Sequence, residues 1–347
     1  MKNIKILAFS LLTVLPFVSY GKDIKEILSE YEEASDLSNK TKIENLGHYI
    51  VITRRELDIM QAYTLTDVLK SLKLYTYIPN RFGIYQLVSA GSSVGSNTSY
   101  KLFIDDHEVS SIHTDSPFLI FDRYPLDNID HIKIYSGAGA VRIGNEPSLI
   151  IIKLYTKEPS RENASVLRTS VSSRRDYTIS FNDARVIKDI SYNLLISRSY
   201  ENFPTYRLFS TNLSRDTKRN YLFLKLNYQD TSLDISFADV KRDAFGGLAV
   251  DFSSTFSRTS SQDFYINLTQ KFLEDKSLKL NLSVDINRRE GEFANDLAGG
   301  GVFLAPIYPD NPTSDSLKIP TYYYEKRDFN KYTLYISKEF KTEKTRS

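Results

Sequence analysis

The sequence predicts an α+β domain followed by antiparallel transmembrane β-barrel strands, which together form an incomplete barrel of about eight strands. Three observations predict this arrangement. Before Lys157, capped helical segments alternate with short strands, whereas after it apolar and polar residues alternate with a period of two. The connections between these later strands are short and long in turn.

The composition excludes several classes of protein. The 347 residues contain no Cys and no Trp, and 45 Lys and Arg stand against 43 Asp and Glu. Without cysteine there are no disulfides, zinc–thiolate sites, iron–sulfur clusters or cysteine nucleophiles. The balanced charge argues against nucleic acid as a partner, because binding phosphates needs a surplus of Lys and Arg on one surface.

Residues 1–21 have the pattern of a secretory signal peptide. Two lysines precede an apolar run from Ile6 to Val18, and the small residues Ser19 and Gly21 predict cleavage after Gly21. The apolar run is shorter than the roughly 20 residues that cross a bilayer as a helix. No later window of the sequence holds 18 consecutive apolar residues, so a return to the membrane would require a closed β-barrel.

Residues 22–47 are predicted to be a separate N-terminal segment. Apolar residues spaced by three and four between 23 and 38 favour a short amphipathic helix, and a solvated acidic leader is the alternative. The next stretch begins with a strand at 48–53. Thr53 and Glu56 form a capping-box pattern that opens a helix over 54–60, and Thr64 opens a second one. Further strands are predicted at 83–88, 100–105, 129–135 and 148–156.

After Lys157 the chain is predicted to form strands with one apolar and one polar face. Such alternation suits both a soluble sandwich and a membrane barrel, because each hides one face of every strand. Weaker rows begin at Tyr177, Ile190, Leu233, Phe264 and Tyr332. The clearest rows are Leu222, Leu224, Leu226 and Tyr228, and Leu278, Leu280, Leu282, Val284 and Ile286.

Connection lengths favour the barrel. Counting a faint first strand at 164–172, eight strands follow one another, and their connections alternate in length beyond the first hairpin. Short turns on one side and long loops on the other are typical of outer-membrane barrels, whereas a sandwich has no reason to sort its loops. The short connections lie near 184–188, 229–231 and 272–276, and the long ones near 200–218, 243–261 and 289–328.

Four segments together carry a family resemblance. Residues 128–157, NIDHIKIYSGAGAVRIGNEPSLIIIKLYTK, are preceded by YIVITRREL, LTDVLKSL and YKLFIDDHEV in the same order and at similar spacing. In these segments the chain resembles the plug domain of TonB-dependent outer-membrane receptors, and barrel-like strands follow as they do in that family. Where the family usually has Asp-Gly in a hairpin, this chain has Asp105-Asp106, and 22–47 contain no recognisable TonB box.

The resemblance implies a function and a cellular location. Residues 48–157 would be the plug and 158–347 the N-terminal part of the barrel, placed in a Gram-negative type of outer membrane by a cleaved signal peptide. Such a receptor takes up a scarce small-molecule ligand, such as an iron chelate or cobalamin, and a TonB-type energy-coupling protein drives it. Its partners would also include outer-membrane lipids, with no enzymatic activity and no cofactor.

The predicted strand number implies an incomplete receptor. Barrels of this family have 22 strands, and about eight strands cannot enclose a plug, because barrel diameter grows with strand number. The chain is therefore expected to be the N-terminal fragment of a longer receptor. Two alternatives stay open: a small outer-membrane barrel with a periplasmic domain in a structural or adhesion role, and a soluble secreted β-rich binding protein.

Ligand contacts are predicted in two strand-to-strand segments of the plug, 89–99 and 111–121. They offer hydroxyl, amide, charged and aromatic groups of the kind that line a small-molecule pocket. No catalytic set and no metal site is predicted, since the four histidines are scattered and the pair Asp105-Asp106 beside His107 is explained by turn chemistry. The candidate ligand-binding residues are Ser92, Ser93, Asn97, His113, Asp115, Phe118 and Phe121.

The alternation also predicts which residues tolerate change. Leu224 and Leu282 would face lipid, and substitution of the lumen-facing Lys225 or Asn281 should cost far less than an Arg at either leucine. Aromatic residues near strand ends, among them Tyr221, are predicted to form the belts that anchor a barrel at the membrane interfaces.

Overall fold

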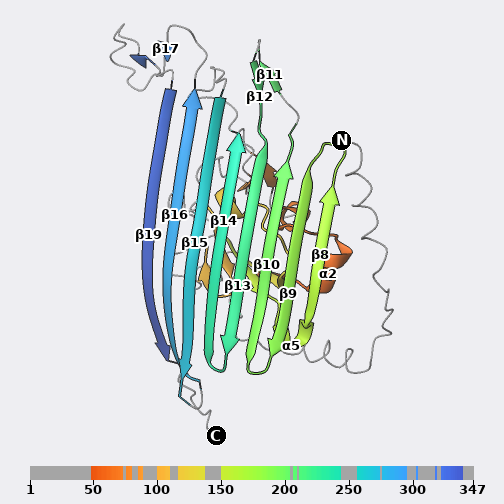
Figure 1. The fold of residues 1–347 in the computed structure, drawn as a ribbon, viewed down its shortest axis with the longest axis vertical. Helices are drawn as coiled ribbons and strands as arrows, with labels where there is room; N and C mark the ends of the chain where they lie inside the picture. Colours follow the sequence, from red (N-terminus) through yellow and green to blue (C-terminus); the bar gives the residue numbers. More distant parts are fainter. Residues whose placement is uncertain are drawn as a thin grey trace, which may run out of the picture. The chain divides into compact units, whose positions relative to one another are not determined.

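The computed structural model describes thirteen stretches of the chain, and these belong to one compact unit, Gly47–Ser347. The described residues are 48–72, 76–79, 85–88, 100–109, 116–136, 150–203, 206–208, 211–243, 256–273, 276–294, 302–303, 317–318 and 322–338. Within them, a small α+β domain precedes a large antiparallel sheet (Figure 1).

The α+β domain is built on a mixed sheet that has five strands in the described residues, in the order β1-β6-β7-β4-β5. Strands β4 and β7 are parallel and the other neighbours are antiparallel. The strands are β1 (His48–Ile52), β4 (Tyr100–Ile104), β5 (His107–Glu108), β6 (Ile129–Ser136) and β7 (Ile150–Thr156). The predicted strands at 48–53, 100–105, 129–135 and 148–156 are confirmed.

Two predicted helices begin at the predicted caps. In α2 (Arg54–Ile59) the backbone N–H and the hydroxyl of Thr53 both donate to the Glu56 carboxylate, and the Glu56 N–H donates back to the Thr53 hydroxyl. In α3 (Leu65–Ser71) Asp67 accepts in the same way from Thr64. Two short helices, α4 (Phe118–Phe121) and α5 (Pro159–Glu162), were not predicted. Part of the predicted 111–121 loop is therefore helical.

Removing the first cap should loosen α2 alone. Thr53→Ala is expected to cost about 0.5–2 kcal/mol, because it deletes the hydroxyl that satisfies an otherwise unpaired backbone donor. Amide hydrogen exchange of residues 54–59 measures the loss. Thr53→Ser keeps the hydroxyl and serves as the matched control; equal exchange in both variants would contradict the role of the cap.

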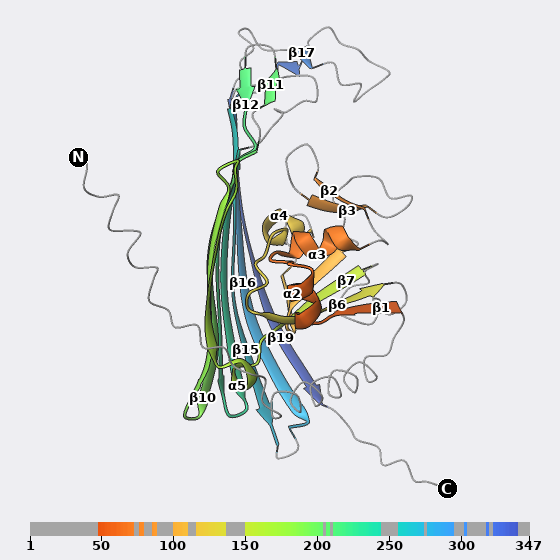
Figure 2. The same ribbon diagram turned by 90° about the vertical axis from the view of Figure 1, so that its right-hand side faces the viewer.

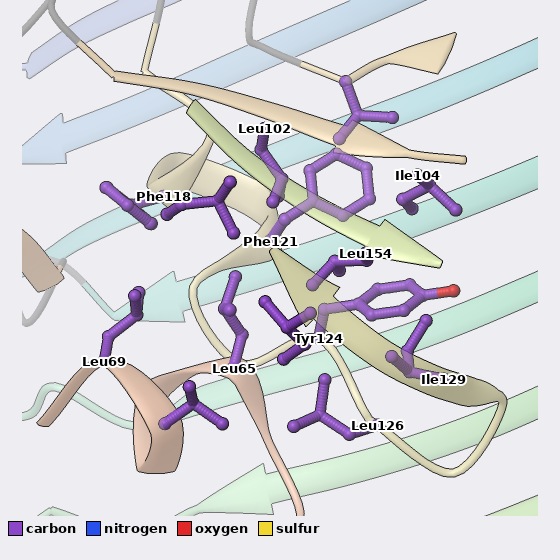
Figure 3. Packing of buried hydrophobic residues seen from close by; sticks show 14 of the residues in the cluster. Leu65, Leu69, Leu102, Ile104, Phe118, Phe121, Tyr124, Leu126, Ile129 and Leu154 are labelled. Atoms are coloured by element: carbon purple, nitrogen blue, oxygen red, sulfur yellow. The ribbon is translucent and has the colours of Figure 1, made fainter. Parts of the chain in front are cut away.

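Helices α3 and α4 pack on one face of this sheet and close a hydrophobic core. Leu65 and Leu69 of α3 meet Leu102 of β4 and Leu154 of β7 there, and each of these four side chains has no exposed surface (Figure 3). Fully burying a side chain of this size contributes about 1.5–3 kcal/mol relative to leaving it exposed. The α+β domain therefore has a core of its own.

The second element is an antiparallel sheet of eight strands within the described residues, arranged in chain order (Figure 1). Its strands are β8 (Ala164–Val171), β9 (Tyr177–Ile187), β10 (Ile190–Glu201), β13 (Thr217–Tyr228), β14 (Thr231–Asp243), β15 (Phe256–Phe272), β16 (Leu278–Ala294) and β19 (Tyr322–Lys338). Two-stranded ribbons add β2 (Thr76–Pro79) with β3 (Tyr85–Val88), β11 (Tyr206–Leu208) with β12 (Thr211–Leu213), and β17 (Val302–Phe303) with β18 (Leu317–Lys318).

The large sheet is open. Its outermost strands, β8 and β19, do not pair with each other in the part of the chain that the structure describes. The prediction of an incomplete barrel of eight strands is confirmed. The predicted alternation of short and long connections is also confirmed, with the long ones between β10 and β13, β14 and β15, and β16 and β19.

Strands β16 and β19 run further into the predicted 289–328 loop than their apolar rows indicate. The added ladder pairs charged residues across the two strands, with Lys326 Nζ 3.5 Å from a Glu290 carboxylate oxygen and Arg288 Nε 3.7 Å from Asp328. Opposite charges on directly paired or neighbouring positions stabilise a sheet without burying apolar surface. Apolar alternation alone therefore underestimates these strands.

The predicted apolar rows lie together on one face of the large sheet. Leu222, Ile266 and Leu282 are 36%, 37% and 42% exposed, whereas Phe223 and Tyr265, on the opposite face, are 1% exposed. Figure 2 shows the α+β domain on that opposite face. In the described stretches, no helix is both long and apolar enough to span a bilayer.

Candidate functional site

The α+β domain is fixed to the large sheet by charged side chains, and the most buried contact centres on Asp122, the residue after α4. The Asp122 carboxylate has no exposed surface and accepts hydrogen bonds from Arg219 Nη2 on β13 at 2.9 Å and Arg242 Nη2 on β14 at 3.2 Å. Arg219 also pairs with Glu201 of β10, and Arg123 Nη1 lies 2.7 Å from the same glutamate. We refer to these five residues as the buried ion cluster.

The electrostatics of the cluster depend on the two arginines of the sheet. Burial alone would oppose ionisation of Asp122, but Arg219 and Arg242 outweigh it and lower the pKa of that carboxyl below its ordinary value. Arg242 also donates to the backbone carbonyl of Leu119 at 2.5 Å, and the Tyr221 hydroxyl donates to the carbonyl of Ile120 at 2.6 Å. The sheet therefore holds α4 by its backbone as well as by its charge.

Tyr221 is consequently not part of an aromatic belt. It is 3% exposed, and its ring meets that of Tyr124 edge to face at 5.5 Å on the inner face of the sheet. The prediction was wrong because position along a strand does not decide the face. Tyr221 lies one, three and five positions before Leu222, Leu224 and Leu226 of the apolar row. Because successive side chains of a strand point to opposite faces, the alternation could have placed Tyr221 on the inner face.

A second contact joins the β4–β5 hairpin to the sheet, and we call it the turn contact. Lys225 Nζ on β13 lies 2.6 Å from Asp105 Oδ2, and Lys279 Nζ on β16 lies 2.8 Å from Asp106 Oδ2. His107 Nε2 is 2.7 Å from Asp285 Oδ1, and its ring lies 4.0 Å from that of Tyr265. Every residue of this turn contacts the sheet.

Asp105 joins the turn to two other elements. Its φ of 52° is in the left-handed region that Asp tolerates and Gly favours. Its carboxylate accepts hydrogen bonds from the Thr156 N–H at 2.8 Å and the Thr156 hydroxyl at 2.7 Å, besides the Lys225 contact. A glycine at this position would fit the backbone but lose all three contacts.

Lys225 and Asn281 lie on the inner face as predicted, and both side chains have partners there. Lys225 is bound to Asp105, and the Asn281 amide donates to Asn267 at 2.8 Å and to Thr269 at 2.9 Å. The alternation identified the inner face for both residues, but their partners come from other strands and from the α+β domain.

The turn contact should weaken in acid. Burial opposes the charge of Asp106, but Lys153 and Lys279 overcome it and lower its pKa from 3.8 to about 2. A lowered pKa contributes stability that is present above the unfolded-state pKa and is lost as the pH falls through the folded-state pKa. The melting temperature is expected to fall between about pH 4 and about pH 2. Tyrosine fluorescence measures it, and Asp106→Asn, the control, should give a flatter curve; an identical curve would contradict this.

A third contact lies at β8, at the opposite edge of the sheet from β19. Arg168 Nε and Nη2 donate to the two carboxylate oxygens of Asp127 at 2.8 and 2.6 Å, and the guanidinium carbon lies 4.7 Å from the centre of the Tyr63 ring. Such a two-pronged pair fixes orientation as well as position. The α+β domain is thus held at strands across the width of the sheet.

Most of the predicted ligand-binding residues, Ser92, Ser93, Asn97, His113 and Asp115, lie outside the described residues. Phe118 and Phe121 are each 1% exposed in α4. The Phe121 ring lies 6.4 Å from that of Tyr221. Phe118 and Phe121 therefore pack in the core. The ligand-binding role of the seven residues stays a prediction. The described ranges contain no group of three or more His, Asp or Glu side chains arranged to hold a metal ion.

Comparison with models of protein families gave no match, and comparison with curated proteins gave none either. Solved structures do match. A mutant of the ferric enterobactin receptor PfeA from Pseudomonas aeruginosa has a TM-score of 0.55 at 12% identity over 85% of this chain and 46% of that chain. The ferric yersiniabactin uptake receptor FyuA from Yersinia pestis gives 0.52 at 15% identity over 72% and 42%. The unliganded ferric citrate transporter FecA gives 0.50 at 16% identity over 73% and 41%.

These matches define the fold. The chain has the plug-and-barrel fold of TonB-dependent siderophore receptors, so the predicted resemblance is confirmed at the level of fold. We therefore call the α+β domain the plug. The chain spans less than half the length of these solved structures. The matched proteins are transport receptors rather than enzymes.

Proposed function

We propose that this chain is the plug and the first part of the barrel of a TonB-dependent outer-membrane receptor. In this proposal residues 1–21 are a signal peptide, 22–47 a periplasmic segment, 48–157 the plug and 158–347 barrel strands. The receptor imports a scarce small molecule, and the plug gates the barrel. The observation that carries the proposal is a plug bound through buried charges to the inner face of an open, outwardly apolar sheet.

The apolar outer face supports the membrane part of the proposal. Leucine, isoleucine and aromatic side chains of successive strands lie exposed on one face, where a soluble sheet would carry polar groups. Exposed apolar area of this extent marks a surface that contacts something other than water. Outer-membrane lipid fits it, with the open edges completed by further strands.

An iron chelate is the ligand class that we propose, because the solved structures of similar fold are receptors for ferric enterobactin, ferric yersiniabactin and ferric citrate. Cobalamin is the alternative. The predicted ligand-binding residues in 89–99 and 111–121 would contact the ligand from the plug. The energy-coupling protein would act on the N-terminal segment.

Uptake by cells tests the proposal. Cells that lack their own siderophore and cobalamin receptors would express the complete receptor of which this chain is proposed to be the first part, and would receive radioactive ferric enterobactin, ferric citrate or cyanocobalamin. Uptake of one probe that requires the energy-coupling protein is the expected result. Retained uptake when 89–99 and 111–115 are replaced by Gly and Ser would remove those segments from the site. No uptake and no binding of any probe would overturn the receptor function.

A further inference from the structure

Three basic side chains lie close together on the apolar face of the large sheet, opposite the plug. Arg198 is in β10, Lys218 in β13 and Lys241 in β14, and these strands are neighbours (Figure 1). Two or four positions away in the same strands are exposed apolar residues, at Ile196, Leu222 and Phe237. Because side chains two apart in a strand point to the same face, the three cations share the face of the apolar rows. We call them the basic patch.

The basic patch is at the end of the sheet where the connections are long. Lys218 is near the start of β13, and Arg198 and Lys241 are near the ends of β10 and β14. From these ends the chain enters the long connections between β10 and β13 and between β14 and β15. In the proposed receptor the long connections face the outside of the cell, so the patch would lie at the outer margin of the membrane.

The register of the strands brings the three cations within reach of one another. Lys218 is directly paired with Lys241 across β13 and β14. Paired residues of antiparallel strands have Cβ atoms about 4.5–5.5 Å apart, and like charges there destabilise a sheet. Arg198 is paired with Asn220, so Lys218 is its diagonal neighbour, at roughly 7–8 Å. An anion between the three side chains would relieve their repulsion.

No carboxylate of the described residues supplies that anion. Arg198, Lys218 and Lys241 are exposed and form no ion pair in the described stretches of the chain. The Lys218 Nζ lies 5.9 Å from the centre of the Tyr200 ring, which leaves its positive charge unneutralised.

Three carboxylates lie within two residues of the patch in sequence, and each is bound to other groups. Asp239 is 8% exposed and accepts hydrogen bonds from the amides of Asn220 and Gln262, both at 3.2 Å. Asp216 accepts from the Tyr200 hydroxyl at 2.6 Å. The remaining one is Asp243, which accepts from the Ser214 hydroxyl at 3.0 Å and lies 4.0 Å from Arg258.

The same polar band is electrically matched further along the sheet. Ser260 is paired with Lys241 on one side and with Glu290 on the other, so Glu290 belongs to the same cross-strand row. There Lys326 Nζ of β19 lies 3.5 Å from the Glu290 carboxylate of β16. The unmatched positive charge of this row is therefore on β13 and β14, beside Arg198.

The chemistry of the patch and of its surroundings points to one kind of partner. Arginine binds phosphate through two parallel hydrogen bonds, and lysine binds it as a point charge. The apolar rows continue directly from the patch towards the short connections, and such a surface binds acyl chains. A free phosphate would use only the cations, whereas a lipid would use both surfaces.

We propose that the basic patch binds the anionic phosphate of an outer-leaflet lipid, whose acyl chains lie along the apolar rows of β10, β13 and β14. The lipid neutralises the repulsion between Lys218 and Lys241 and fixes the height of this part of the sheet in the membrane. This inference rests on the membrane location in the proposed function, but it does not require uptake.

Binding of lipid A, a glycolipid with phosphate groups, tests the site. The complete receptor would be purified in a neutral detergent, and native mass spectrometry would give the dissociation constant of lipid A. Arg198→Gln, Lys218→Gln and Lys241→Gln are each expected to weaken binding about fivefold. Lipid A whose phosphates have been removed should bind the unchanged receptor as weakly as intact lipid A binds the triple variant.

The matched control lies in the same row. Lys326→Gln combined with Glu290→Gln removes a neutral pair from the same face and should leave the affinity for lipid A unchanged. Equal affinities of the control and the three patch variants would overturn the site, and so would tight binding of phosphate-free lipid A. Displacement of lipid A by an equal concentration of inorganic phosphate would show that the patch binds free phosphate, which also overturns the proposal.

Thermal unfolding separates a lipid site from a structural role of the lysines. Lys218→Gln removes the like charge opposite Lys241, so the melting temperature without lipid A is expected to stay the same or to rise. Lipid A should raise the melting temperature of the unchanged receptor more than that of Lys218→Gln, because a ligand stabilises the state that binds it. A Lys218→Gln variant that melts lower without lipid A would show that Lys218 stabilises the sheet itself, and the site would be overturned.

This proposal and the transport function fail in different ways. If the receptor takes up none of the radioactive probes but its binding of lipid A depends on the basic patch, the transport function fails and the lipid site stands. If uptake occurs and the patch variants bind lipid A as tightly as the unchanged receptor, the transport function stands and the lipid site is overturned.

Discussion

Asp122→Asn is expected to destabilise the attachment of the plug by about 3–5 kcal/mol, the largest effect of any change considered for this protein. The substitution keeps the shape of the side chain but removes its charge. The buried Arg219 and Arg242 then lose the carboxylate that both of them contact. The urea concentration at which protease begins to cleave residues 116–136 measures the loss.

A matched control separates burial from charge. Asp58 forms a shorter pair with Arg54, at 2.6 Å, but is 64% exposed, so Asp58→Asn should cost about 0–1 kcal/mol. Equal effects of the two substitutions would contradict the role of burial. If Asp122→Asn fails to fold, Asp122→Leu combined with Arg219→Met and Arg242→Met tests the same idea. This change removes the three most buried charges together and leaves Glu201 paired with Arg123, and such a replacement by apolar residues is often close to neutral.

Leu282→Arg is expected to cost about 2–4 kcal/mol if the sheet lies in lipid, because Leu282 is at the centre of the five-residue apolar row of β16. The guanidinium would then be in the hydrocarbon layer. Refolding of the complete receptor into lipid vesicles, followed at increasing urea concentration, measures the cost.

The control is on the same face but at its margin. Ile187 ends β9 beside a short turn and is 57% exposed, so Ile187→Arg should cost only about 0–1 kcal/mol near the membrane interface. A similar cost at both positions would show that depth in a bilayer does not matter. The sheet would then be water-soluble, which would favour the binding-protein alternative.

The fold of this protein could be predicted from local patterns in the sequence. Thr53 with Glu56 and Thr64 with Asp67 specify where two helices begin, since a cap depends on residues three apart. The period of two fixes which face of each strand is apolar, because successive side chains point to opposite sides. These signals are short-range, and the structure confirms them.

The attachment of the plug could not be predicted in this way. Asp122 meets Arg219 and Arg242 across 97 and 120 residues of sequence, and Lys225 meets Asp105 across 120. Nothing in the spacing of a charged residue tells which opposite charge it will face. The short helix α4 was missed for a related reason, since four residues are too few for helical periodicity and the sheet holds α4 through Arg242 and Tyr221.

The sequence by itself therefore determined the order of the elements, the apolar face of each strand and the position of the first two helix caps. The tertiary structure alone decided which inner-face side chains bind the plug, because ion pairs and hydrogen bonds form between residues that only folding brings together. Asp105 is an example of both. Its place in a turn follows from local chemistry, but its contacts with Thr156 and Lys225 exist only because β7 and β13 lie beside that turn.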